Sequence, residues 1–359
     1  MKILIVDDQE LVVLSLEKCL LDLGYEVVSA NTIIDGIQKY DLHSPDLVIA
    51  DINMPFSNDP DQTSNLDESQ NAYNGLEIAK HIKITKGKAT PIMILSGNTD
   101  EDTIVKGFDL GVDDYMKKPL SLNEIGARVK RLIGSGVKES SNTQKNQIIQ
   151  NNCIGVVIPC YNEELRLLGD EFKAFINSNL GYHLCFVNDG SKDNTLGVLQ
   201  ELCKGNEDRI SIYNCEKNGG KAEAVRLGML HLAKDSQYNY IGFLDADLST
   251  NFDDFQELVN TISNSKYKIV SGSRINRMGA DIAKESARKI ISQGINFIIR
   301  KTLGMDFKDT QCGAKIMHKE IVEKTFQKKF LTKWLFDVEI FMRMKKIYGK
   351  QGAIDLICE

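Results

Sequence analysis

Two aspartates separated by a single residue follow a strongly apolar run in the second half of the chain. Asp245 and Asp247 come directly after Tyr240–Leu244, a run of strand length. Acids two residues apart at the end of a strand point to the same side. Such a pair suits Mg²⁺ or Mn²⁺, which take oxygen ligands and keep substrate phosphates in their shell. An isolated Asp-x-Asp is more often a pair of solvated turn acids, so its meaning depends on its surroundings.

A second set of reactive side chains lies in the first third of the chain, at the ends of short β-branched runs. The set comprises Asp7, Asp8, Asp51, Ser96 and Lys118. Three acids, a hydroxyl and a lysine that converge at one sheet edge would form a magnesium-assisted phosphoryl-acceptor pocket.

The elements that must bring this set together alternate regularly. Each short apolar run is followed by an amphipathic stretch of helix length, and the runs are Lys2–Val6, Glu26–Ala30, Leu47–Ala50, Ile92–Leu95 and Asp114–Met116. This rhythm predicts a parallel sheet with helices on both faces. Functional groups are then expected at the carboxyl ends of the strands.

A second series of strand-like runs follows, and it comprises Cys153–Pro159, His183–Asn188, Arg209–Tyr213, Tyr240–Leu244 and Lys268–Gly272. Polar groups again follow the runs, in the segments Tyr161-Asn-Glu163, Asp189-Gly-Ser-Lys-Asp193, Asn218-Gly-Gly-Lys221 and Asp245-Ala-Asp247. The glycine spacing matches neither a Walker P-loop nor a dinucleotide fingerprint. The pattern indicates a nucleotide-binding edge with a metal.

Length and composition agree with two soluble domains. A chain of 359 residues is too long for one ordinary core. Gly134–Asn152 is polar and weakly periodic, so we predict domains at residues 1–134 and 153–359 joined by a linker at 135–152. The formal net charge of −6 gives no basic footprint for nucleic acid.

The cysteines and the apolar runs favour a cytoplasmic protein. The 8 cysteines are scattered and none forms a Cys-x-x-Cys pair, which is typical of reduced, buried thiols. Ile3–Val6 is far too short for a signal peptide, and no later segment approaches a membrane span.

The first domain resembles the receiver domain of two-component response regulators, whose fold is flavodoxin-like. The resemblance is carried by Asp7-Asp8, Asp51-Ile-Asn-Met-Pro55, Ser96-Gly97 and Tyr115-Met-Lys-Lys118-Pro119. It implies phosphorylation of Asp51 by a sensor histidine kinase or a phosphotransfer protein. The implied Mg²⁺ ligands are Asp7, Asp8, Asp51 and the backbone carbonyl of Asn53. The implied phosphoryl-binding and switch residues are Ser96, Tyr115 and Lys118.

This sequence departs from the receiver pattern at Phe56–Tyr73. The segment is rich in Ser, Asn, Asp and Gln, and it stands where the family has only a few residues. Its composition predicts a polar loop beside the phosphorylation site. It is either a tolerated surface insertion, which we favour, or an element that controls access or binds a partner.

The second domain resembles family 2 glycosyltransferases of the nucleotide-diphospho-sugar (GT-A) fold. The motifs that carry the resemblance are Val157-Ile-Pro-Cys-Tyr-Asn-Glu163, Val187-Asn-Asp-Gly-Ser-Lys-Asp193, Asn218-Gly-Gly-Lys221 and Asp245-Ala-Asp247. The resemblance implies a nucleotide-diphospho-sugar donor whose nucleotide base would be hydrogen-bonded by Asp189. The implied donor-binding residues are Pro159, Tyr161, Asn162, Glu163, Asp189, Asp193, Asn218, Lys221 and Asp245. Asp245 and Asp247 would hold Mg²⁺ or Mn²⁺ on the diphosphate, where metal and Lys221 offset the leaving-group charge.

Later motifs look most like the subgroup that transfers sugars to dolichyl or other polyprenyl phosphates. They are Ser271-Gly-Ser-Arg274, Asp309-Thr-Gln-Cys-Gly-Ala-Lys315 and Trp334-Leu-Phe-Asp-Val-Glu339. A phosphate acceptor is already ionised and needs no strong base. Its candidate contacts are Arg274, Arg288, Arg300 and Lys315. A hydroxyl acceptor would need a carboxylate base, and Asp309 is the first candidate.

Helical geometry separates two acids near the end of the chain. Asp337 falls on an apolar face, so it needs a partner as a site residue or as a buried structural acceptor, and we favour the site. The catalytic candidates are therefore Asp309, Asp337 and Arg274. Glu339 and Arg343 are explained as a surface pair at i, i+4.

The polyprenyl-phosphate subgroup usually continues beyond the position that corresponds to Ile357-Cys-Glu359. This raises the alternatives of a fragment, of a partner that supplies membrane docking at the inner membrane face, or of a soluble acceptor.

Together these patterns predict a receiver followed by a phosphorylation-regulated glycosyltransferase. The residues from Asp100 to Ile133 would form the switching face, which packs in a receiver homodimer or against the transferase. The alternative is a response regulator whose second domain binds nucleotide-sugar or a partner protein without turnover.

Overall fold

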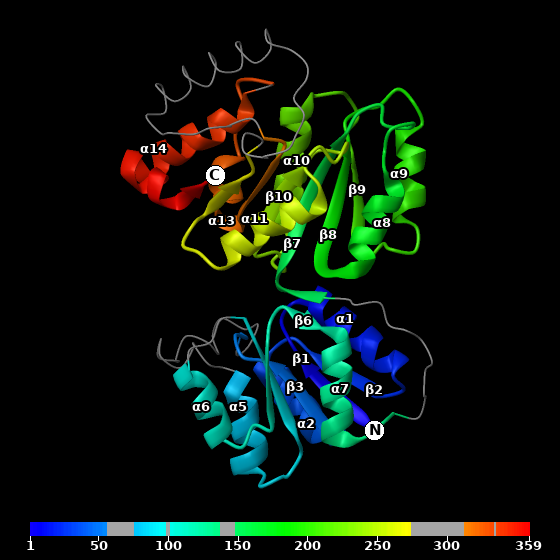
Figure 1. Ribbon diagram of the computed structural model, residues 1–359, viewed down its shortest axis with the longest axis vertical. Helices are drawn as coiled ribbons and strands as arrows, with labels where there is room; N and C mark the ends of the chain where they lie inside the picture. The colour runs from blue at the N-terminus through cyan, green and yellow to red at the C-terminus, as the bar shows by residue number, and fades with distance from the viewer. Residues whose placement is uncertain (56–74, 98–100, 137–147, 274–311, 334) are drawn as a thin grey trace, which may run out of the picture. The chain divides into compact units, whose positions relative to one another are not determined.

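The computed structural model describes residues 1–55, 75–97, 101–136, 148–273, 312–333 and 335–359. The chain divides into two compact units, the first formed by residues 1–153 with 176–182 and the second by residues 154–175 with 183–359. Each unit has its own sheet, which confirms the prediction of two α/β domains (Figure 1).

The first unit is built on a parallel sheet with the strand order β2-β1-β3-β4-β5. The strands are β1 (Lys2–Val6), β2 (Glu26–Ala30), β3 (Leu47–Asp51), β4 (Ile92–Ser96) and β5 (Asp114–Lys117), followed by the short β6 (Leu120–Ser121). The helices are α1 (Glu10–Asp22), α2 (Ile33–His43), α5 (Gly75–Lys80) with its π-helical continuation η1 (His81–Thr85), α6 (Glu101–Asp109) and α7 (Leu122–Ile133). This is the flavodoxin-like, doubly wound arrangement that the sequence predicts.

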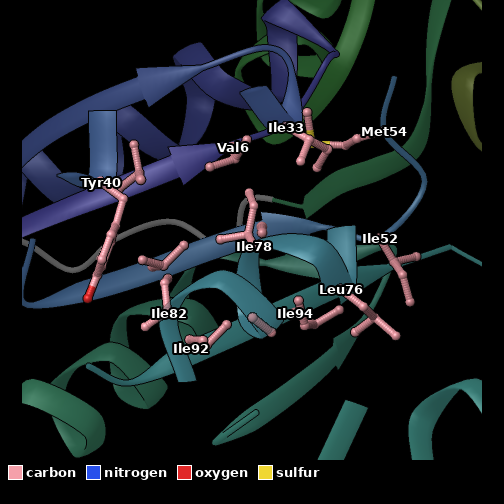
Figure 2. Close-up of a cluster of buried hydrophobic side chains, with 14 of the residues drawn as sticks. Val6, Ile33, Tyr40, Ile52, Met54, Leu76, Ile78, Ile82, Ile92 and Ile94 are labelled. Atoms are coloured by element: carbon pink, nitrogen blue, oxygen red, sulfur yellow. The ribbon is translucent and has the colours of Figure 1, made fainter. Parts of the chain in front are cut away.

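One face of this sheet forms a continuous apolar core with α2, α5 and η1 (Figure 2). Val6, Ile92 and Ile94 project from the strands toward Tyr40 of α2 and Ile78 of α5. The strand residues of this core alternate along each strand, because successive side chains of a strand point to opposite faces. The polar residues at or just after the strand ends, among them Asp7, Asp51 and Ser96, lie together at the carboxyl edge of the sheet.

The second unit contains a mixed sheet with the order β13-β11-β12-β10-β7-β8-β9. Its strands are β7 (Ile148–Cys160), β8 (Asn179–Asn188), β9 (Ile210–Asn214), β10 (Tyr240–Leu244), β11 (Ile269–Ser271), β12 (Ala314–His318) and β13 (Ile357–Cys358). Its helices are α8 (Gly169–Ser178), α9 (Thr195–Cys203), α10 (Lys221–Ala233), α11 (Phe252–Ser263), α13 (Lys319–Thr325) and α14 (Phe336–Leu356).

Two features of this unit differ from the sequence-based expectation. Strand β7 begins at Ile148, inside the stretch that was predicted as a linker. Strand β12 was not predicted, and it runs antiparallel to both β10 and β11. In the register of the β10–β12 pair Leu244 lies opposite Ala314, so the residues after β10 meet the residues before β12.

Candidate functional site

Three carboxylates meet at the carboxyl edge of the first sheet. Asp7 follows β1, Asp8 is its neighbour, and Asp51 is the last residue of β3. Each offers an oxygen within 4.8 Å of the others. Asp7 and Asp51 are buried, whereas Asp8 is exposed at the rim. The parallel register of β1 and β3 produces this convergence from positions far apart in the sequence.

Lys118 supplies the only positive charge that the described residues place within this group of acids. Its ammonium lies 2.9 Å from Asp7 and 3.4 Å from Asp51, and the side chain is 2% exposed. Burial opposes the charged form, but the carboxylates of Asp7 and Asp51 outweigh it and raise the pKa of Lys118 above its ordinary value. Lys118 therefore stays a cation beside the predicted phosphorylation site.

The acids of this edge carry more negative charge than Lys118 neutralises. Burial, reinforced by the charges of Asp7 and Asp8, raises the pKa of Asp51 to about 7 although Lys118 lowers it. Burial and the neighbouring Asp7 raise the pKa of Asp8 to about 6. A crowded set of oxygen ligands with unneutralised charge fits the chemistry of Mg²⁺, so these residues can hold the ion that the resemblance implies.

The remaining predicted receiver residues surround this edge. The hydroxyl of Ser96, at the end of β4, is 1% exposed and finds no hydrogen-bond partner among the residues that the structure describes. Such an orphan donor suits an incoming phosphoryl oxygen. Tyr115 is partly buried, with its ring 6.5 Å from that of Phe108, and Asn53 lies exposed just after β3.

Gly75 is a site residue whose role sequence reasoning missed. A Cβ at this position would lie 2.2 Å from the backbone oxygen of Asp51, so only glycine allows the start of α5 to approach the strand end. Its amide donates to the carbonyl of Ile52 at 3.0 Å. Pro55, before the predicted insertion, accepts the amide of Ile33. Both flanks of the insertion are thus held at the site, while Phe56–Tyr73 itself lies outside the described residues.

In the second unit, Asp189 organises a glycine turn. Its two carboxylate oxygens accept the backbone amides of Gly219 and Gly220, each at 2.8 Å. The side-chain amide of Asn218 donates to the Asp189 carbonyl at 3.1 Å. Asp189 is 3% exposed. In this structure it therefore holds the turn that leads into α10, and its predicted contact with a base stays a prediction.

Lys221 and Asp245 meet at the start of α10. Lys221 is the first residue of that helix, and its ammonium lies 2.5 Å from the carboxylate of Asp245, which follows β10. A carboxylate and an ammonium side by side at a helix N-terminus provide charges of both signs for a metal-bound diphosphate. The predicted metal ligand and the predicted phosphate contact are thus neighbours.

Asp247 faces different neighbours from Asp245. Its carboxylate accepts the amide of Ser249 at 2.9 Å. Burial raises the pKa of Glu163, and the charges of Asp247 and Asp193 add to that rise against Arg166. Asp193 and Asp247 therefore lie close enough to Glu163 for their charges to affect its ionisation.

The loops after β7 and β8 are tied to each other. The side-chain oxygen of Asn162 accepts the amide of Lys192 at 2.9 Å, and Asp193 accepts the amide of Glu164 at 3.2 Å. Tyr161 is 38% exposed. Pro159 lies within β7, half-buried. These contacts join the predicted donor-binding segments without showing what they bind.

Asp337 is paired, as an acid on an apolar helix face must be. Its carboxylate lies 2.9 Å from the ammonium of Lys315 on β12, and both side chains are buried. Burial raises the pKa of Asp337, although Lys315 and Lys221 oppose that rise. Because Lys315 is 0% exposed, its expected role as an acceptor contact does not fit this geometry.

Glu339 and Arg343 form the predicted i, i+4 ion pair, but the prediction that the pair lies on the surface is wrong. Their side chains are 15% and 18% exposed and lie 2.6 Å apart. Arg343 also donates to the carbonyls of Lys328 and Lys329, and Glu339 accepts the amide of Leu331. The segment before α14 folds over the pair, so the two residues fix the backbone of that segment.

Four candidate residues lie outside the described residues, and they are Arg274, Arg288, Arg300 and Asp309. Over the residues that are described, no helix has the length and apolar character needed to cross a membrane.

Comparison with known families agrees with this division. Residues 155–326 match the model of glycosyl transferase family 2, and residues 3–130 match that of the response regulator receiver domain. The chain belongs to glycosyl transferase family 2 and carries a receiver domain at its N-terminal side.

The curated relatives narrow the class. A dolichyl-phosphate beta-glucosyltransferase of Dictyostelium discoideum is 31% identical over 231 residues, which cover 59% of this chain and 69% of that protein. The enzyme of the same description from Trichomonas vaginalis is 34% identical, with 52% of this chain and 58% of that protein covered. The human one is 31% identical, with 52% and 61% covered. The chain thus spans between 58% and 69% of the length of these relatives.

Proposed function

We propose that this protein is a phosphorylation-regulated glycosyltransferase that moves a sugar from a nucleotide-diphospho-sugar to a polyprenyl phosphate. The single observation that carries the proposal is the meeting of Lys221 and Asp245, 2.5 Å apart at the N-terminus of α10. Two opposite charges at a helix N-terminus and a glycine turn at one strand edge would form a binding site for a metal-bound diphosphate.

In the transfer step the nucleoside diphosphate leaves, and negative charge grows on its bridging oxygen. Lys221 offsets that charge, and Asp189 keeps the Gly219–Gly220 turn open for the donor. Asp245 and Asp247 would hold Mg²⁺ or Mn²⁺, which supplies Lewis acidity at the diphosphate. A polyprenyl phosphate is already ionised and attacks the sugar carbon without a base, so Arg274 would serve to hold it.

The printed descriptions of the relatives support this acceptor class. They name dolichyl phosphate, a polyprenyl phosphate, as what those enzymes glucosylate. An acceptor of this kind would bring the protein to a membrane surface. If the acceptor instead carries a hydroxyl, Asp309 would take its proton.

For the receiver, we propose that a histidine kinase or a phosphotransfer protein donates a phosphoryl group to Asp51. One carboxylate oxygen of Asp51 attacks phosphorus while the bond to the donor breaks. Lys118 and the hydroxyl of Ser96 then bind the phosphoryl oxygens. Asp7, Asp8 and Asp51, with the Asn53 carbonyl, would hold Mg²⁺, which would neutralise part of this charge. The coupling to transfer would be on the order of 1–3 kcal/mol.

The test is transfer of labelled sugar from UDP-glucose, and from other nucleotide sugars in parallel, to a short polyprenyl phosphate in detergent. We expect a lipid-linked product that is lost in Asp245→Asn and that changes in yield when beryllofluoride occupies the receiver. Binding of a nucleotide sugar without any product would favour the non-catalytic alternative. A product yield unaffected by beryllofluoride would contradict regulation.

A further inference from the structure

The buried pair of Asp337 and Lys315 lies next to the predicted metal ligand Asp245, in a connection that no motif indicates. Lys315 is 0% exposed and Asp337 is 5% exposed. The ammonium of Lys315 lies 2.9 Å from Asp337 and packs 5.6 Å from the ring centre of Phe243. Burying two charges costs solvation free energy, so such a pair is kept only where its geometry has a use or where removing one partner is worse.

Lys315 also contacts the backbone of the turn that precedes β12. Its ammonium donates to the backbone carbonyl of Cys312 at 2.8 Å, which closes the Cys312–Gly313 turn just before β12. One lysine therefore joins this turn to the first turn of α14, where Asp337 lies.

That turn touches Asp245 directly. A Cβ added to Gly313 would lie 2.1 Å from a carboxylate oxygen of Asp245, so the carboxylate rests on the Gly313 backbone. The β10–β12 register brings the two together, because Leu244 lies opposite Ala314. On its other side the same carboxylate meets Lys221. The position of the Cys312–Gly313 turn thus limits the orientations that Asp245 can adopt.

We infer that Asp337 and Lys315 are positioning residues that fix the Cys312–Gly313 turn and thereby orient Asp245 toward the donor-bound cation. Asp337 neutralises Lys315, and Lys315 holds the turn. In this arrangement Asp337 touches neither donor nor acceptor, which differs from the catalytic role expected from the sequence. The inference rests on the proposed donor site, because it assigns these residues to the cation of that site.

The test measures binding of Mn²⁺ together with UDP or GDP to the full chain by calorimetry. The variants are Asp337→Asn, Lys315→Met and the double variant with both changes. Each single change removes a contact that connects Asp337, Lys315 and the Cys312–Gly313 turn. We therefore expect about a tenfold loss of Mn²⁺-dependent nucleotide affinity in each single variant. The double variant should lose no more than the worse single variant, because both residues act through the same turn.

The double variant also protects the test against simple unfolding, since replacing both buried charges with uncharged side chains of similar size is often tolerated. Glu320→Gln, which breaks partly exposed ion pairs with Lys268 and Lys324, serves as the control and should bind as wild type does. A conservative change, Asp337→Glu, should restore part of the affinity, which a loss of general stability would not predict.

The outcomes separate the two proposals. If the wild type shows no Mn²⁺-dependent nucleotide binding, the proposed donor site fails and this inference fails with it. If the wild type binds and Asp337→Asn binds equally well but gives no transfer, Asp337 is catalytic and the inference is overturned. If the fold-losses of affinity in the two single variants multiply in the double variant, the two residues act independently and the inference is also overturned.

Discussion

The ammonium of Lys118 lies 3.4 Å from the carboxylate of Asp51, with both side chains buried at the carboxyl edge of the first sheet. Because Asp7 holds the same ammonium at 2.9 Å, the lysine is anchored while it faces the nucleophile. Charge developing on a transferred phosphoryl group would therefore meet a fixed cation.

The first prediction follows from that arrangement. Acetyl phosphate with Mg²⁺ should place one phosphoryl group on the full chain, and Asp51→Asn should remove it. Intact-mass spectrometry before and after hydroxylamine treatment measures the adduct. Asp22→Asn, at an exposed position of α1, is the control and should be phosphorylated normally. An adduct that persists in Asp51→Asn would show that another residue is the acceptor.

The second prediction concerns pH. The pKa of Asp51 is raised from 3.8 to about 7, so the folded receiver binds a proton that the unfolded chain releases. Its free energy of unfolding without Mg²⁺ should therefore fall as pH rises from about 4 to about 7, by on the order of 2–4 kcal/mol. Thermal unfolding from pH 5 to pH 8 measures this. Asp51→Asn or added Mg²⁺ should weaken this dependence of the unfolding free energy on pH. If the variant shows the same dependence as wild type, protonation of Asp51 is not its cause.

A third prediction tests the metal. Binding of a nucleoside diphosphate should weaken at least about tenfold when a chelator removes Mg²⁺ or Mn²⁺, and Asp247→Ala should cause a similar loss. Calorimetry on both proteins, with and without chelator, gives the comparison. Asp253→Ala, at an exposed position in the first turn of α11, should behave as wild type does. Equal affinity in every case would mean that Asp247 is a solvated turn residue.

A fourth prediction addresses the turn that Asp189 holds. In Asp189→Asn one oxygen is replaced by an amide group that cannot accept from Gly219 or Gly220, which leaves one partly buried donor unpaired. We expect a loss of roughly 1–3 kcal/mol in stability and weaker nucleotide binding. Thermal melting and calorimetry measure the two effects. Asp208→Asn, at a side chain that is 52% exposed, is the matched control. If the two variants behave identically, Asp189 does not hold the Gly219–Gly220 turn.

The fifth prediction uses the close approach of α5 to the phosphorylation site. In Gly75→Ala the new Cβ would overlap the backbone of Asp51, so α5 or β3 must move. We expect a destabilisation of roughly 1–3 kcal/mol and slower phosphorylation. Gly87→Ala, at a glycine with nothing within 4 Å of its Cβ, tests whether any glycine change has this effect. Its positive φ adds local strain, so phosphorylation rate and not stability is the informative comparison.

The sequence predicted the receiver almost completely, because its pattern is local. The bounds of β1 and β2 match the structure, and β3, β4 and β5 each end one residue later than predicted. Asp7, Asp51, Ser96 and Lys118 stand at or directly after a strand end, where the rule for parallel sheets places them. The role of Gly75 escaped notice because it depends on a steric contact with a strand distant in sequence.

The second unit was less predictable for the same physical reason. Strand β12 is short and carries Lys315 as its second residue, and a fully buried lysine breaks the apolar pattern of a core strand. The partner of Asp337 could not be identified, since the pairing depends on how α14 packs against β12. Glu339 and Arg343 appeared exposed on a helical wheel, which cannot show that another segment folds over them.

The register that places Gly313 beside Asp245 also has a consequence for the order of folding. The receiver strands come in close succession, so its core can form early while the chain is still being synthesised. The donor-site edge must wait for β12 and α14, which follow β10 only after a long intervening stretch. A ribosome-bound chain would therefore carry a competent signal-receiving half before its transferase half could bind a cation, and the late-arriving strand is where a folding chaperone would have most effect.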